Sequence, residues 1–422
     1  MKTLKNIGKI ALLSLALCGG TTSCNYLDVV PPEQASLPDA TKDPESTLGF
    51  LFSCYGGIRN PFDYQTVEAG ADEYVLPPLW NTGSQKITWD LNLPTNIADG
   101  WSWGSNYRFI GQCLLFLQQL PHARGVTDEQ KRAWAAEANF LLAYYHMVTL
   151  VAYGPCPITD TYIDQATPES EYNGRMHFDY VKDWICQKFD EVCEDGQLPA
   201  TRTGDEWGRA TSVMAKALKA RLLVYAASPL FNGSFPYKDW ENTNFETPGY
   251  GKELISLKYD RKKWEVAKAA CQEAITAAEA AGHKLFSLED AQSLYQQAGL
   301  PLPFVPFKSA EGGTADKDKE FMERVQLMRY VVTTRYKEGN RETIWGLANQ
   351  GTMIIGSLPH RVIKNNQGTW KAGYSGVSPT LNTVEHFYTE NGVPIEKDKQ
   401  FYPQSEWYQS AGVCLLYTSP SP

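Results

Sequence analysis

The spacing of apolar residues predicts three long amphipathic helices in the middle of the chain. In each one, apolar side chains recur every three or four residues, which places them on one face of an α-helix. The first begins after Thr127, whose T-x-x-Q spacing to Gln130 is that of a capping box, and ends at the Gly-Pro of residues 154–155. The second is expected over about 209–227 and the third over 264–282.

Weaker helical patterns cover about 44–56, 103–120 and 177–194. Alanine is dense in the second and third strong helices, so neighbouring helices can approach closely. Paired helices with such contact faces are typical of tetratricopeptide-type proteins, although no clean repeat of about 34 residues is visible. We therefore expect a mainly α fold, in which tetratricopeptide-like helix pairs form a scaffold over about 41–282.

The segments outside these helices are long and irregular. Residues 229–260 carry many aromatic side chains, a density that predicts an ordered insertion rather than a linker. Residues 327–336 and 341–348 have the composition of short strands. We expect residues of about 283–412 to form a largely irregular, loop-rich part that carries short strands.

The first 23 residues have the pattern of a secretory signal peptide. A lysine-rich start precedes an apolar run over 10–17, too short for the about 20 residues of a spanning helix. Small residues then lead to Cys24, a placement that resembles the lipobox of bacterial lipoproteins, in which the new first residue is acylated. We predict a signal peptide over 1–23, lipidation at Cys24 and a Pro-rich extended tether over 24–40. An ordinary signal peptide with an incidental cysteine is the alternative.

Charge and motifs argue for binding rather than catalysis. The formal net charge of −9 argues against a nucleic-acid partner. The sequence holds no HExxH, GxSxG, Walker or GxGxxG motif, its six histidines are solitary, and its cysteines lack metal-ligand spacing. We therefore expect no metal, no cofactor and no enzyme activity. A glycoside hydrolase stays an alternative, because paired carboxylates converge only in the fold.

Four blocks resemble the SusD/RagB family of outer-membrane, nutrient-binding lipoproteins of Bacteroidetes. In chain order they are CNYLDVVPPEQ, AEANFLLAYYHMVTLVAYGPCPI, GRATSVMAKALKARLLVYAASPLFN and SPTLNTVEHFYTENGVPI. One departure is Leu142, which stands where many members carry Arg. The second is length, since members continue well past the last block. We therefore expect a C-terminally truncated member whose residues 413–422 are a non-native tail.

The resemblance implies a function and partners. Members capture glycans or similar nutrients at the cell surface and sit as a lid on a TonB-dependent (SusC-like) outer-membrane transporter. The chain is accordingly expected to be lipid-anchored in the outer membrane and to face the cell exterior. A lipid-anchored tetratricopeptide scaffold for protein partners is the alternative, and it would not need an exposed aromatic surface.

A glycan site needs flat aromatic rings for the apolar face of a sugar and polar side chains for its hydroxyls. Residues 72–108 offer this mixture, and resemblance also places part of the family's glycan platform there. The first candidates are Trp80 and Trp89, with Asp72 and Asn81 as polar partners; Tyr336 and Trp345 form a second set. The alternatives are that these rings pack in the core, or that residues 229–260 line the site.

Overall fold

The computed structural model describes most of the chain between residues 37 and 297 and parts of the region beyond it. The described residues are 37–58, 70–77, 83–93, 95–96, 103–164, 166–297, 324, 327–328, 331, 334–336, 339–346, 363–364, 367, 370–371, 377–389 and 391–399. The predicted signal peptide, Cys24, Trp80, Asn81 and the predicted tail at 413–422 therefore lie outside the described residues.

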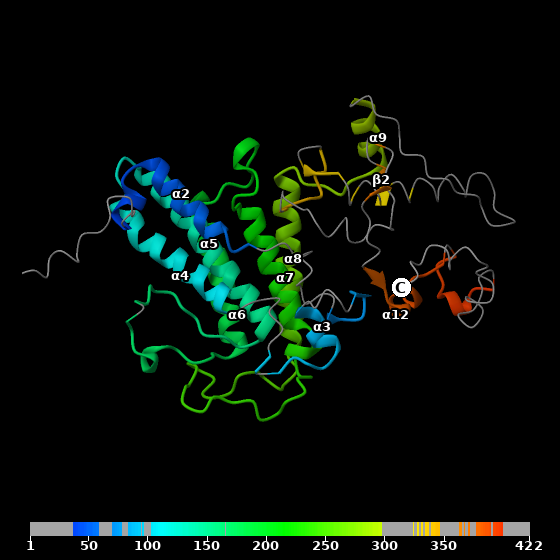
Figure 1. Ribbon diagram of the computed structural model, residues 1–422, viewed down its shortest axis with the longest axis horizontal. Helices are drawn as coiled ribbons and strands as arrows, with labels where there is room; N and C mark the ends of the chain where they lie inside the picture. The colour runs from blue at the N-terminus through cyan, green and yellow to red at the C-terminus, as the bar shows by residue number, and fades with distance from the viewer. Residues whose placement is uncertain are drawn as a thin grey trace, which may run out of the picture.

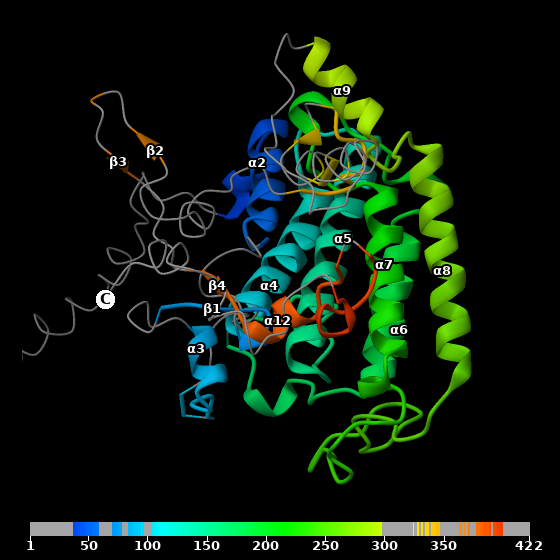
Figure 2. The ribbon, with the colours of Figure 1, turned by 90° about the vertical axis from the view of Figure 1, so that its right-hand side faces the viewer.

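Six helices lie side by side and make the body of the molecule (Figures 1 and 2). They are α2 (Pro44–Tyr55), α4 (Trp103–Gln119), α5 (Asp128–Tyr153), α6 (Phe178–Glu191), α7 (Ser212–Ala227) and α8 (Arg261–Ala280). From α4 onward each packs on the next, and α2 packs on α4 and α5. This is the mainly α arrangement of packed helix pairs that the sequence predicts.

Shorter elements surround this body. The short α-helices are α3 (Gly83–Thr88), α9 (Leu288–Gln297) and α12 (Leu381–Glu385). Antiparallel strands pair β1 (Tyr74–Val75) with β4 (Ser378–Pro379), and β2 (Ile363–Lys364) with β3 (Trp370–Lys371). The 3-10 turns are η1 (Leu37–Thr41), η5 (Leu120–His122), η6 (Glu169–Glu171), η7 (Glu194–Gly196), η8 (Gly204–Glu206), η9 (Pro229–Phe231) and η11 (Ile395–Lys397). None of the helices in the described part of the chain is long and apolar enough to cross a membrane.

The helix boundaries follow the capping chemistry of the sequence. The predicted capping box opens α5: the Gln130 amide donates to Thr127 Oγ1 over 3.2 Å, and the Thr127 amide donates to Gln130 Oε1 over 3.0 Å. Helix α7 begins later than predicted, because Thr211 is its N-cap. Helix α8 begins earlier than predicted, after the N-cap Asp260.

The two strands predicted late in the chain are wrong for the residues described there. Leu327, Met328 and Val331 are helical, and residues 341–346 form turns and bends. Leu327 and Val331, four residues apart, both pack against the small cluster of Phe286 and Ala291, as two positions on one helix face do. Branched and aromatic residues are common wherever a surface is half-buried, so they do not by themselves distinguish a strand from a helix.

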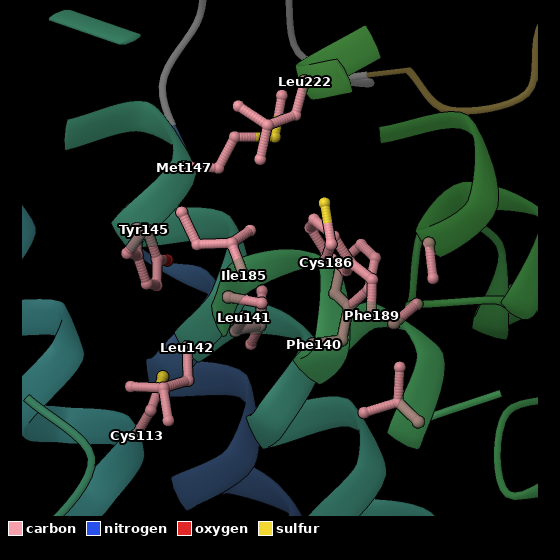
Figure 3. Packing of buried hydrophobic residues seen from close by; sticks show 14 of the residues in the cluster. Cys113, Phe140, Leu141, Leu142, Tyr145, Met147, Ile185, Cys186, Phe189 and Leu222 are labelled. Carbon is pink, nitrogen blue, oxygen red and sulfur yellow. The ribbon is translucent and has the colours of Figure 1, made fainter. Parts of the chain in front are cut away.

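The core lies where α5 meets its neighbours (Figure 3). Phe140, Leu141, Leu142 and Tyr145 of α5 are almost fully buried, among residues of α4, α6 and α7. Leu142, the departure noted in the sequence, is 2% exposed, so this position has an apolar environment. On α8 the buried residues are alanines, which bring it close to α7: Ala267, Ala270, Ala274 and Ala278.

A buried ion cluster crosses the helical body at Glu137 of α5, whose side chain is fully buried. Its carboxylate accepts from Arg202 Nη2 over 2.9 Å, from Arg209 Nη2 over 2.6 Å and Nε over 3.0 Å, and from the Tyr55 hydroxyl over 2.6 Å. The Tyr55 oxygen also accepts from the Ala210 amide over 2.9 Å. The cluster thus joins α2, α5 and the connection between α6 and α7.

We expect the change Glu137→Gln to lower the free energy of unfolding by about 3 kcal/mol, because Arg202 and Arg209 lose their buried counter-charge and keep only the exposed carboxylate of Glu206. Urea unfolding followed by circular dichroism measures this. The control is Glu129→Gln in the exposed first turn of α5, for which we expect less than about 1 kcal/mol. Equal effects of the two changes would contradict a special role for Glu137.

His146 is a fully buried neutral histidine in α5. Its Nδ1 lies 2.8 Å from the Leu142 carbonyl oxygen, so Nδ1 carries the proton, and its Nε2 accepts from the Thr159 amide over 3.1 Å. Burial lowers the pKa of His146 from 6.5 to about 4, despite the opposing effects of the Leu142 carbonyl and Asp160.

This shift predicts a pH dependence of stability. Below pH 6.5 the unfolded chain binds a proton at His146 that the folded chain does not, so stability present at neutral pH is lost as the pH falls toward 4. Chemical unfolding across this window should show the wild type losing about 3 kcal/mol more than a His146→Gln variant. Parallel pH profiles of the two proteins would exclude this role.

Candidate functional site

Two neighbouring segments, 70–77 and 83–93, meet a third that lies far along the chain, 378–389, beside α3 and α12 in Figure 2. Strand β1 pairs with β4, and the Gln85 side chain of α3 donates to the Leu76 and Pro77 carbonyls over 3.3 and 2.6 Å. We call the assembly of residues 70–77, 83–93 and 378–389 the corner. It carries two of the predicted site residues, Asp72 and Trp89.

Asp72 holds the start of α12. Its carboxylate Oδ2 accepts from the Asn382 amide group, and its backbone carbonyl accepts from the Thr380 and Thr383 hydroxyls. Thr380 is itself the N-cap of α12, since its hydroxyl accepts from the Thr383 amide over 3.1 Å. Asp72 therefore has a positioning role within the corner, in addition to any contact with a ligand.

Trp89 presents its ring to solvent. It follows α3. Its backbone amide donates to the Gln85 carbonyl over 3.0 Å, and this hydrogen bond fixes the backbone at Trp89. The side chain is 48% exposed, and Leu91 and Leu93 on the same short segment are also exposed. Trp89 is therefore not packed in the core, which was the alternative interpretation. A half-exposed indole ring on a turn that is held by a hydrogen bond can pack against a flat apolar face of a ligand.

The second predicted set, Tyr336 and Trp345, meets at Trp207 and Gly208. The Tyr336 ring stacks on Trp207 with centroids 5.5 Å apart, and the Arg341 guanidinium lies 4.5 Å from its centroid. Trp345 donates from Nε1 to the Gly208 carbonyl over 3.0 Å.

The rings of this second set have different surroundings. Trp345 packs edge-on against Phe140 and Tyr144 of α5, so much of its surface is committed to the core. Tyr336 is half-buried and lies against His283, which follows α8. Because His283 lies between α8 and α9, Tyr336 is near the start of α9, whereas the corner contains α3, which lies away from α9 in Figure 2.

Trp207 is an aromatic residue of this set that the sequence analysis did not select. It lies directly after η8 in the polar stretch TGDEWGR. Trp80 and Trp89 are selected because aromatic and polar residues mix in their segment, and the same mixture of Trp207 with Asp205, Glu206 and Arg209 would have found Trp207 as well.

The described residues hold no group of three or more His, Cys, Asp or Glu side chains that could bind a metal ion. The six described cysteines are free thiols. Burial raises the pKa of both Cys156 and Cys186 to about 12, so these thiols stay protonated at neutral pH and behave as small core residues. What the corner and the Trp207 set offer is aromatic surface beside polar groups.

Comparison with solved structures identifies the architecture. The chain is similar to the protein BT4246, with 52% identity and a TM-score of 0.78 over 88% of this chain and 61% of that one. A SusD-like protein from Bacteroides fragilis matches with 17% identity and a TM-score of 0.58, over 86% of this chain and 57% of that one. The chain has the SusD-like fold. The resemblance and the fold class predicted from the sequence are thereby confirmed.

Further comparisons qualify this match. A SusD-like carbohydrate-binding protein from Bacteroides fragilis shares the fold with 16% identity and a TM-score of 0.52, over 85% of this chain and 56% of that one. No protein-family model and no curated protein matches the chain. The chain spans about three fifths of the length of the solved SusD-like structures named above.

We expect Asp72→Ala to loosen the corner without disturbing the helical body, because it removes the carboxylate that binds Asn382. Hydrogen exchange of the amides in 378–386 should become about fivefold faster, which corresponds to the loss of one exposed hydrogen bond. The isosteric Asp72→Asn keeps an acceptor oxygen and should show a smaller effect. Unchanged exchange in Asp72→Ala would show that the β1–β4 pairing alone holds α12.

Proposed function

We propose that this chain is a cell-surface lipoprotein that binds glycans without altering them and passes them to a TonB-dependent outer-membrane transporter. The observation that carries the binding proposal is the half-exposed indole of Trp89 on the corner. The lipid anchor at Cys24, the outer-membrane location and the SusC-like transporter rest on the sequence blocks that resemble the SusD/RagB family.

The corner suits a sugar for physical reasons. The C–H face of a pyranose is apolar and packs on a flat ring, and the hydroxyls around its edge need polar side chains. Trp89 supplies the ring, and Asp72 and Asn382 are polar groups of the same corner. Trp80 and Asn81 belong to the segment that leads into α3, and we propose them as further contacts.

Two further observations support binding over a purely structural role. A solved protein of the same fold is described as a carbohydrate-binding protein. A scaffold for protein partners would use the helical faces and has no need of an anchored, solvent-facing tryptophan. We also propose Tyr336, with Trp207 beside it, as a second aromatic contact for a longer glycan, and Trp345 as the residue that positions this set.

We expect Trp89→Ala to weaken oligosaccharide binding about tenfold, since one stacking platform is worth somewhat more than 1 kcal/mol. Titration calorimetry of the purified chain against a panel of oligosaccharides, with reducing ends assayed in parallel, tests this. The matched control is Trp264→Ala on α8, where the ring is 42% exposed. New reducing ends would overturn the non-catalytic proposal, and equal losses in both variants would overturn the location.

A further inference from the structure

A pocket of about 230 Å³ opens in the aromatic segment 229–260, and none of its lining residues belongs to the corner or to the Trp207 set. It is lined by Tyr237, Lys238, Trp240, Glu241, Glu253, Ile255 and Leu257. This segment forms the loops beyond the ends of α6 and α7 at the bottom of Figure 2.

The pocket wall combines aromatic rings with charged groups. Tyr237 is 70% exposed, so most of its ring is open to solvent, and Trp240 is half-buried beside it. Glu241 and Glu253 oppose each other in an antiparallel bridge, an arrangement that puts both side chains on the same side of the backbone. Glu241, Glu253 and Lys238 all line the same pocket, so residues that can accept and donate hydrogen bonds stand next to aromatic and aliphatic ones.

The backbone around the pocket is held in place by contacts with the helical body. The Asn242 side chain donates to the Arg175 carbonyl over 2.6 Å, and the His177 amide, at the start of α6, donates to Thr247 Oγ1 over 2.9 Å. Trp240 stacks on Phe235 with centroids 5.5 Å apart and an interplanar angle of 11°. A site that is rigid before binding loses little conformational freedom when a ligand enters.

These features restrict the class of ligand. Two carboxylates disfavour an anion, and the charged wall disfavours a purely apolar molecule. A volume below the roughly 300–1,000 Å³ of drug-sized ligand pockets favours one small ring over an extended chain. A pyranose meets each requirement: an apolar face for the tyrosine or tryptophan ring, and hydroxyls that donate to carboxylates and accept from a lysine.

We propose that this pocket is a second carbohydrate subsite, separate from the corner, that takes a single uncharged pyranose ring. Tyr237 is the platform, Trp240 is the rigid wall, and Glu241 and Glu253 accept from ring hydroxyls. The proposal shares its ligand class with the proposed function but does not depend on Trp89.

Saturation-transfer NMR of the full chain with the methyl glycosides of glucose, galactose, mannose and N-acetylglucosamine tests this subsite. At least one glycoside should bind saturably with a millimolar Kd. Its affinity should fall at least tenfold in Tyr237→Ala and in the isosteric double variant Glu241→Gln/Glu253→Gln. The matched control is Tyr259→Ala, an exposed tyrosine of the same segment that does not line the pocket, and it should bind normally.

The Trp89→Ala variant separates the two sites. If the pocket is a subsite of its own, this variant keeps monosaccharide binding although it loses oligosaccharide affinity. The proposal is overturned if no glycoside binds the wild-type chain, or if the signal survives both pocket variants. It is also overturned if Trp89→Ala abolishes the signal, since the corner would then account for it.

Discussion

The buried carboxylate of Glu137 is the constraint on which the arrangement of the chain depends. A charge without water has to be met by cations and hydrogen-bond donors, and here they come from α2 and from the connection between α6 and α7. Arg202 and Arg209 lie in the connection before α7, so this connection has to fold back onto α5. The same connection carries Trp207 and Gly208, which receive Tyr336 and Trp345. The connection that holds the core charge is thus also the one on which the second aromatic set packs.

The positions of the other two surfaces, the pocket and the corner, depend on hydrogen bonds near the ends of helices rather than on the buried core. The pocket segment is tied down at the start of α6, where the His177 amide bonds to Thr247 and the Phe178 amide bonds to the Leu254 carbonyl over 2.8 Å. The corner is tied down through backbone carbonyls that accept from Gln85 and Thr380. In both places irregular backbone gains order from side-chain and loop hydrogen bonds, which leaves aromatic rings free to face solvent.

How far the sequence predicts this structure depends on whether the signal is local. The capping box of α5 and the period of its apolar residues are local, and both were predictable. That Leu327, Met328 and Val331 are helical was not predictable, because the packing of Leu327 and Val331 on the cluster of Phe286 and Ala291 is not a local signal. Nor was the position of Asp72, whose carboxylate binds Asn382 from the other end of the described chain. The polar residues around Trp89 in the sequence indicate that its side chain is exposed. The pairing of Glu241 with Glu253 in the pocket was not predictable, because it depends on a backbone bridge that no local pattern indicates.

The contacts of Asp72 also indicate how the corner would divide its binding energy. The Asp72 carboxylate already accepts from Asn382 at Oδ2, and a sugar hydroxyl that bonds to it exchanges one hydrogen bond with water for another, so the net gain from that contact is small. Trp89 is 48% exposed, so a sugar that stacks on its ring also buries apolar surface. Stacking should therefore provide most of the affinity at the corner, while Asp72 contributes mainly by keeping α12 against β1. In the proposed binding role, affinity and architecture would therefore depend on different residues of the corner.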